Sequence, residues 1–205
     1  MMDRSVSGIS RCIRLAREGK AEALDDLLAS YRNYLRLLAA TSLDPDVRSK
    51  ADASDVVQET LLKAHLSFPD FRGTTEGEWI TWIRQILVHN LADLHRRFSL
   101  KGRKVSRERS LEAAMDRSSL ILRNLVAAAG PSPSQEAERR EMSVILADTL
   151  AELEPEDREV VILRNLQELD WNEIAKRTGR SPDAARMLWT RALQRVGGLL
   201  KERLR

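Results

Sequence analysis

The side chains of this 205-residue chain that are best suited to chemistry are the arginines near its C-terminus. A guanidinium group can donate paired hydrogen bonds to a phosphate or to the edge of a guanine base. Such groups bind nucleic acid rather than catalyse a reaction, and they need an element that presents them on one side. The arginines in question, opposed only by Asp183, are Arg180, Arg186, Arg191 and Arg195.

A second group of side chains suggests a different chemistry. Asp52, Asp55 and Glu59 could together hold Mg²⁺ in an enzyme that acts on nucleic acid, and the last two share one helical face. No nucleophile, general base or glycine-rich phosphate loop accompanies them. The three histidines lack metal-ligand spacing with carboxylates, and the single cysteine, Cys12, excludes an internal disulfide and a cysteine-based zinc site. We therefore expect no catalytic residues, no metal and no cofactor.

The arginines lie within residues 171–196, a segment with the pattern of two helices joined by a tight turn. Gly179 comes four residues after Ala175, where the backbone must reverse and often needs a positive φ. Ser181 can cap the following helix, and Pro182 fits its first position. That helix also has an apolar inner stripe, formed by Ala185, Leu188 and Ala192.

This pattern predicts a helix-turn-helix unit that places its second helix in the major groove of DNA. The simpler alternative is a helical hairpin whose arginines are only solvated. The small residue, the glycine, the cap and the basic helix occur together in the order that DNA binding requires, which favours the first interpretation.

Charge is unevenly distributed, although 34 basic and 31 acidic residues leave a net charge of only +3. Seven lysines and arginines lie between His95 and Arg109, a density that suits phosphates. Six acids lie between Asp148 and Glu159, a density that suits a basic protein surface. Either block alone could be ordinary solvated surface. No apolar run approaches the roughly 20 residues that cross a bilayer, and no signal peptide precedes the first helix, so we expect a cytoplasmic protein.

Apolar residues recur at helical spacing along nearly the whole chain, without a β pattern of useful length. Helices are expected over residues 6–18, 21–42, 52–68 and 79–98, and from 137 to the end with breaks at Pro155, near Leu169 and at Gly179. The predicted fold is all-α, with two small helical domains at 1–98 and 137–205, the second a helix-turn-helix. Residues 99–136 are expected to be a flexible linker with at most one marginal helix.

The helix that Asp52 can cap is expected to have two different faces. Val57, Leu61, Ala64 and Phe68 share one face and can enter a core. The opposite face combines acids, an amide and leucines, which suggests a docking surface for a basic protein; the alternative is a helix buried on both sides. The residues on this opposite face are Asp55, Gln58, Glu59, Leu62 and Leu66.

The helix expected at 79–98 combines a broad apolar face with a basic end. Trp79 and Trp82 beside basic residues could stack on unpaired bases, but packing in a core is the stronger alternative for them. Asn90 falls inside the apolar stripe, where a polar side chain needs a partner. Seen alone, it is more often a satisfied buried amide than a residue that reads a base.

Three blocks, in this order, resemble the extracytoplasmic-function (ECF) sigma factors of bacterial RNA polymerase. The resemblance covers about residues 9–98 and 137–200, and it implies core RNA polymerase and promoter DNA as partners. The blocks are DASDVVQETLLKAH, then FRGTTEGEWITWIRQILVHNLADLHRR, then LAELEPEDREVVILRNLQELDWNEIAKRTGRSPDAARMLWTRALQRV.

The resemblance also implies roles for individual residues. The resemblance implies that the polymerase clamp is contacted by Asp55, Gln58, Glu59 and Leu62. It implies that the polymerase flap is contacted by the segment 153–166. In the family, a second set of residues recognises and opens the −10 promoter region, and the loop matched by 71–78 holds a flipped base. The residues of this chain that match this set are Phe71, Arg72, Gly73, Trp79, Trp82, Asn90, Arg96 and Arg97. The residues implied to read the −35 element are Arg180, Ser181, Asp183, Ala184, Arg186, Met187 and Arg191.

Departures from the family leave two points open. The interval from Trp82 to Asn90 looks one residue longer than in the commonest version, so the resemblance does not fix the base-contacting roles along that helix. Arg180 stands where the turn usually has an apolar residue, and Leu188 and Trp189 replace a common Arg-Leu pair, so the resemblance does not fix which side of the helix meets DNA. No sensing domain is visible, so we expect control by another protein such as an anti-sigma factor. The alternative function is a free-standing helix-turn-helix regulator that binds operator DNA, although neither a dimer seam nor a ligand pocket is evident.

Overall fold

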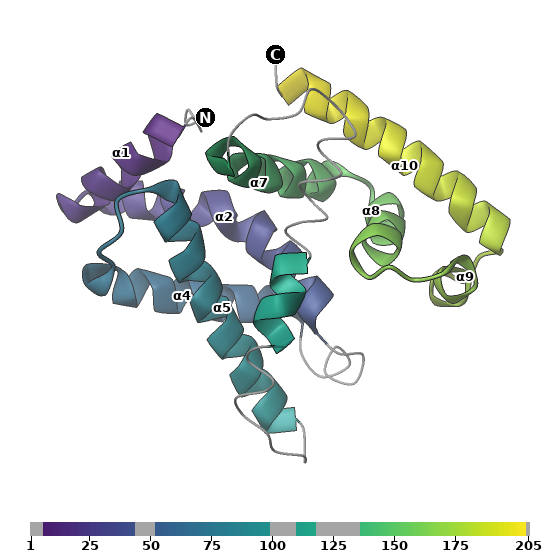
Figure 1. The fold of residues 1–205 in the computed structure, drawn as a ribbon, viewed down its shortest axis with the longest axis horizontal. Helices are drawn as coiled ribbons and strands as arrows, with labels where there is room; N and C mark the ends of the chain where they lie inside the picture. Colours follow the sequence, from purple (N-terminus) through teal and green to yellow (C-terminus); the bar gives the residue numbers. More distant parts are fainter. Residues whose placement is uncertain (1–5, 44–51, 99–109, 118–135, 204–205) are drawn as a thin grey trace.

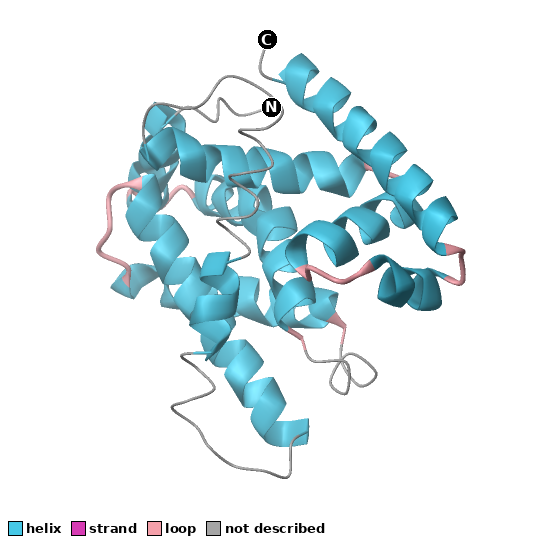
Figure 2. Cartoon of the chain, turned by 45° about the vertical axis from the view of Figure 1, so that its right-hand side comes forward, coloured by secondary structure: helices cyan, strands magenta, loops and turns pink. Residues whose placement is uncertain are grey.

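The computed structural model describes residues 6–43, 52–98, 110–117 and 136–203, and every regular element in these ranges is a helix (Figure 2). This confirms the all-α fold class. None of the described helices is both long and apolar enough to cross a membrane.

Four helices form the N-terminal part of the molecule (Figure 1). They are α1 (Val6–Arg17), α2 (Ala21–Ser42), α4 (Ala53–Ser67) and α5 (Glu76–Phe98), with the short 3-10 helix η1 (Phe68–Asp70) between the last two. Helix α2 packs against the other three, so its apolar stripe forms the middle of their common core. The fully buried side chains there include Leu35, Leu38, Ile83, Leu87 and Leu91.

Helix α4 begins and packs as its sequence predicts. The Asp52 carboxylate accepts a hydrogen bond from the Ser54 backbone N–H at 3.2 Å, which satisfies one of the unpaired donors at the helix start. The four side chains of the expected inner face, at positions 57, 61, 64 and 68, are all buried. Full burial of an aliphatic or aromatic side chain stabilises a fold by roughly 1.5–3 kcal/mol, so this face fixes the rotation of α4 about its axis.

Helix α5 begins at Glu76, three residues before the expected start at Trp79. The expected start was wrong because a capping box precedes it. The Thr75 hydroxyl accepts a hydrogen bond from the Glu78 N–H at 3.3 Å, and the Glu78 carboxylate accepts one from the Thr75 N–H at 3.0 Å. The Thr-x-x-Glu spacing was the sequence signal that could have located this start.

The predicted linker contains a helical segment, residues 110–117, that belongs to the buried core. Leu111 and Met115 are buried, and the Asp116 carboxylate accepts a hydrogen bond from the Arg84 guanidinium of α5 at 2.6 Å. The apolar run at 120–126 lies outside the described residues.

The C-terminal part consists of four α-helices and one π-helical stretch. These are α7 (Glu136–Glu152), α8 (Pro155–Val161), the π-helix η2 (Ile162–Leu166), α9 (Trp171–Thr178) and α10 (Pro182–Arg203). The long helix α10 packs across α7, α8 and α9, which confirms the expected breaks near 155, 169 and 179. The π-helical stretch was not foreseen from the sequence.

Helix α7 lies against α2, so the two ends of the chain share one continuous buried cluster (Figure 1). At this contact the Asn33 amide of α2 donates a hydrogen bond to the Asp148 carboxylate of α7 at 3.0 Å. The Arg203 guanidinium at the end of α10 lies 3.9 Å from the same carboxylate. The arrangement of the two halves, which the sequence left open, is therefore a packed one in this structure.

Candidate functional site

The outer face of α4 is an exposed surface of acids and leucines. Asp55 and Gln58 are exposed, and Glu59 is partly exposed and forms an ion pair with Lys63 at 2.8 Å. Leu62 is 59% exposed and Leu66 is 69% exposed. The alternative of a helix buried on both sides was therefore wrong. We call the set Asp55, Gln58, Glu59, Leu62 and Leu66 the α4 outer face.

Asn90 is only 3% exposed and joins α5 to α4 through hydrogen bonds. Its amide nitrogen donates to the Thr60 hydroxyl at 2.9 Å, and its amide oxygen accepts from the Lys63 ammonium. Lys63 in turn pairs with Glu59 of the α4 outer face. A buried amide with both groups paired stabilises the contact between two helices, and in this conformation it has no direct access to DNA.

The loop between η1 and α5 is held from both ends. The Arg17 guanidinium of α1 donates hydrogen bonds to the carbonyl oxygens of Phe71 at 2.9 Å and Gly73 at 2.6 Å. A side chain at Gly73 would bring its Cβ within 2.5 Å of the Phe71 ring and 2.6 Å of the Glu78 Cβ, so only glycine fits there without movement. At the other end, hydrogen bonds from the Thr74 and Thr75 backbone and the Thr75 hydroxyl lower the pKa of Glu78, because they favour its charged carboxylate.

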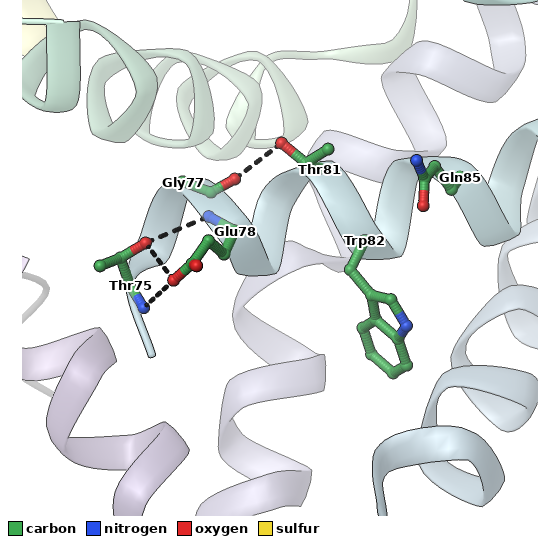
Figure 3. A pocket seen from close by; sticks show the side chains of 6 residues that line it. All are labelled: Thr75, Gly77, Glu78, Thr81, Trp82 and Gln85. Carbon is green, nitrogen blue, oxygen red and sulfur yellow. Dashed lines mark hydrogen bonds between the residues drawn. The ribbon is translucent and has the colours of Figure 1, made fainter. Parts of the chain in front are cut away.

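A hollow of about 410 Å³ lies beside this loop at the start of α5. It is open to solvent, and Figure 3 shows Glu78 turned back toward Thr75 while the Trp82 indole extends from the next turn of the helix. An aromatic ring beside polar groups is the arrangement that accepts a planar, unpaired base. The lining residues are Thr75, Gly77, Glu78, Thr81, Trp82 and Gln85.

The Trp82 ring that lines the hollow packs against two other aromatic rings. The Trp82 ring lies 4.8 Å from the Phe71 ring and 5.3 Å from the Trp79 ring, measured between centroids. Trp79 is fully buried and Phe71 is buried, so both belong to the core in this structure, whereas Trp82 is only partly buried. Of the three aromatic residues expected to contact the −10 region, Trp82 therefore offers surface, and Phe71 and Trp79 position it.

The cations expected near the −10 region lie at opposite ends of α5. Arg72 is exposed in the loop before the helix, and Arg96 and Arg97 are exposed in its last turn. Arg96 also pairs with Asp93 one turn earlier.

The helix-turn-helix of α9 and α10 has the expected local geometry. Gly179 adopts the left-handed conformation with φ 66°, and its N–H donates to the Ala175 carbonyl, which closes α9. The Ser181 hydroxyl accepts a hydrogen bond from the Ala184 N–H at 3.2 Å and so caps α10. The expected inner stripe of α10, positions 185, 188 and 192, is buried.

The opposite side of α10 is therefore exposed. Met187 is 68% exposed, and Asp183, Arg186 and Arg191 are also exposed. Ala184 is partly exposed beside them. Six of the seven residues expected to read the −35 element are exposed or partly exposed on α10 or its cap, and Arg180 lies in the turn just before them.

Two tryptophans lock α9 against α10, an arrangement that the sequence did not predict. The Trp171 and Trp189 rings meet edge to face at 5.6 Å, and the Trp189 indole N–H donates to the Asn165 side chain at 2.7 Å. The guanidinium groups of Arg164 and Arg186 lie over the Trp171 ring at 4.9 Å and 5.7 Å. The aromatic pair fixes the angle of the second helix, and it also restrains Arg186.

Part of the acidic block at 148–159 is satisfied within the chain. Glu156 forms an ion pair with Arg180, and the buried Asp157 forms one with Arg195. These two acids tie the start of α8 to the helix-turn-helix rather than standing free for a basic partner.

Comparison with known proteins places both ends of the chain in one family. Residues 23–99 match the family model described as Sigma-70 region 2, and residues 143–196 match the model described as Sigma-70, region 4. The first contains α4, the loop and α5, and the second contains the helix-turn-helix.

Two curated relatives cover most of this chain. It is 26% identical over 166 residues to the ECF RNA polymerase sigma-E factor of Haemophilus influenzae, which is 80% of each protein. It is 28% identical over 186 residues to the RNA polymerase sigma factor CarQ of Myxococcus xanthus, which is 91% of this chain and 94% of that protein. With two sigma-70 regions matched in order and two relatives that are similar over most of their length, the chain belongs to the sigma-70 family as an RNA polymerase sigma factor of the ECF type, which directs core polymerase to promoters.

Proposed function

We propose that the two halves of this sigma factor divide its work. Residues 1–98 bind the polymerase clamp and open the −10 region, residues 137–205 read the −35 element, and residues 99–136 connect them. The protein acts in the cytoplasm by binding alone, without a cofactor, a metal or a covalent step of its own.

At the −10 region, the hollow beside Trp82 receives a base that has left the duplex. Unstacking a base costs a few kcal/mol, and stacking on an aromatic ring returns about 1–3 kcal/mol. The loop that borders the hollow is already held by Arg17 and by the capping box, so little ordering remains to be done when the base enters. Arg72, Arg96 and Arg97 are exposed along the same helix and loop to bind the backbone phosphates.

At the −35 element, α10 lies in the major groove with its exposed side toward the bases. Each paired contact between an arginine and a guanine contributes about 1–3 kcal/mol of discrimination. Polymerase holds both halves of the sigma factor on one DNA molecule, so the second contact forms at high effective concentration and neither needs to be strong.

The α4 outer face is the observation that carries this proposal. Two leucines more than half exposed, framed by acids, would be unfavourable in water without a partner, and their charge suits a basic protein surface. A free-standing operator-binding regulator has no need of such a face. The same face is the surface that an anti-sigma factor would cover to keep this protein from polymerase.

The test reverses the charge of this face. With Asp55→Lys and Glu59→Lys together, we expect holoenzyme assembly with core polymerase to weaken at least tenfold, because two acids then repel the basic partner surface. Glu202→Lys, exposed near the end of α10, is the matched control and should assemble normally. Assembly would be measured by titrating labelled core polymerase, and transcription from a pooled promoter library would follow. Unchanged assembly in the double variant would refute the proposed docking face.

A further inference from the structure

The most unusual side chain on the DNA-facing side of α10 is Met187. It is 68% exposed, and the other two large apolar side chains that are similarly exposed among the described residues, Leu62 and Leu66, belong to the α4 outer face. At 100° per residue, Met187 lies about 160° around the helix from the buried Ala185 and about 140° from the buried Ala192. It therefore projects directly away from the protein body.

The position of Met187 along α10 is also that of a base-reading residue. It is the sixth residue of the helix, within its first two turns, and the N-terminal residues of a recognition helix are the ones that reach base edges. A contact with the phosphate backbone would call for a cation or a hydrogen-bond donor at this point, and a thioether supplies neither.

Two arginines near Met187 already have partners within the protein, whereas Arg191, one turn later, is exposed. Arg186 is restrained over the Trp171 ring and lies 3.4 Å from the Asp183 carboxylate. Arg180 is engaged by Glu156. These contacts restrain the two guanidinium groups, and the flexible apolar side chain of Met187 is exposed on the same side of α10.

Only one base presents an apolar group in the major groove, and that base is thymine with its 5-methyl group. We propose that Met187 reads a thymine in the −35 element by packing its side chain against this methyl group. The proposal rests on the proposed function, since it assumes that α10 binds the −35 element, and it makes Met187 a residue that sets promoter specificity. A methionine suits this contact because its thioether chain adapts to the shape it meets.

The experiment removes the methyl group and nothing else. A promoter selected from the pooled library is prepared with uracil in place of thymine at each −35 position in turn, on either strand. Holoenzyme affinity and initiation are then measured with the wild-type chain. We expect one position at which uracil weakens binding about fourfold, the factor that corresponds to one buried methyl group. The remaining positions should not respond.

Three variants test whether Met187 makes this contact. Met187→Ala and the similarly sized polar Met187→Gln should bind the thymine promoter about as weakly as wild type binds the uracil promoter, and should not distinguish the two. Met187→Leu should keep the preference. All three change an exposed side chain, so folding is not at risk.

Two results would overturn the inference. One is that no uracil substitution weakens wild-type binding, and the other is that Met187→Ala keeps the full preference for thymine. Both leave promoter-dependent transcription by the wild-type holoenzyme intact, whereas failure of the proposed function would abolish that transcription on every template.

Discussion

At the scale of single residues, the loop before α5 is packed so closely at Gly73 that a side chain at this position would clash with its neighbours. Gly73 has the Phe71 ring and the Glu78 Cβ at distances that no Cβ tolerates. Phe71 is buried and supports Trp82, so the loop cannot shift without moving the ring that lines the hollow. The shape of the candidate base-binding surface therefore depends on residue 73 being a glycine, which has no Cβ.

We predict that Gly73→Ala destabilises the protein by about 1–3 kcal/mol and slows promoter opening, because the loop must move away from the Phe71 ring. The matched control is Gly198→Ala, where an added Cβ meets nothing within 4 Å in α10 and the change should stabilise by about 0.5–1 kcal/mol. Urea unfolding and permanganate footprinting of the opened DNA measure the two effects. Equal stability of wild type and Gly73→Ala would contradict the predicted clash.

Glu78 makes the start of α5 sensitive to acid. Its pKa is lowered below the ordinary value of 4.5 by hydrogen bonds from Thr74 and Thr75, which favour the charged carboxylate. Because the folded-state pKa is the lower one, the stabilisation is present above the ordinary value and is lost as the pH falls through the lowered value.

The backbone amide signals of Thr74 and Thr75 should therefore titrate together in an NMR experiment, with a midpoint below pH 4.5. Glu78→Gln should remove this transition and leave the amide signals of Ser54, which is capped by Asp52, unaffected. A midpoint at or above the ordinary glutamate value would show that the capping box does not form in solution.

At the scale of helices, α4 and α5 are joined by a polar connection inside an apolar contact. Asn90 pairs with Thr60 and Lys63 of α4, and Lys63 pairs with Glu59 on the outer face. The α4 outer face and the helix that lines the candidate base-binding hollow are thus connected through one buried amide.

We expect Asn90→Ala to destabilise the protein by about 1–3 kcal/mol, since it leaves the buried Thr60 hydroxyl without its donor and creates a small cavity. Denaturant unfolding measures this loss. As a comparison, His89→Ala alters the neighbouring exposed residue of the same helix and should change stability by less than about 0.5 kcal/mol. If Asn90→Ala kept full stability and lost only promoter opening, Asn90 would be a DNA contact rather than a structural one.

At the scale of the whole molecule, α7 packs on α2 and unites the two halves (Figure 1). At this contact the Asn33 amide donates a hydrogen bond to the Asp148 carboxylate, which Arg203 also approaches. The free chain should therefore be compact, with a radius of gyration of about 17 Å for 205 residues.

Asp148→Arg should raise this radius in small-angle X-ray scattering, because a second cation then faces Arg203 at the contact with α2. Glu154→Arg, the same change of charge at an exposed residue before α8, should leave the radius unchanged. A wild-type radius well above 17 Å would mean that the two halves separate in the free protein.

Most of the local structure was predictable from the sequence. Helix periodicity, the Asp52 and Ser181 caps and the turn at Gly179 depend on residues within one or two turns of each other, so their spacing alone predicts them. The same periodicity grouped the residues of the α4 outer face, but it left open whether that face was buried, and only the structure shows that it is exposed. The start of α5 was missed although its capping box was visible in the order of Thr75 and Glu78.

Contacts between residues far apart in the chain could be determined only from the tertiary structure. Asn90 donates to Thr60 thirty residues earlier, Arg17 binds the Gly73 carbonyl from another helix, and Trp171 packs edge to face against Trp189. The packing of α7 on α2 belongs to the same class. Periodicity states which side of a helix is apolar, but it carries no information on which other side chain will fill the space opposite, because that depends on how all the helices pack together.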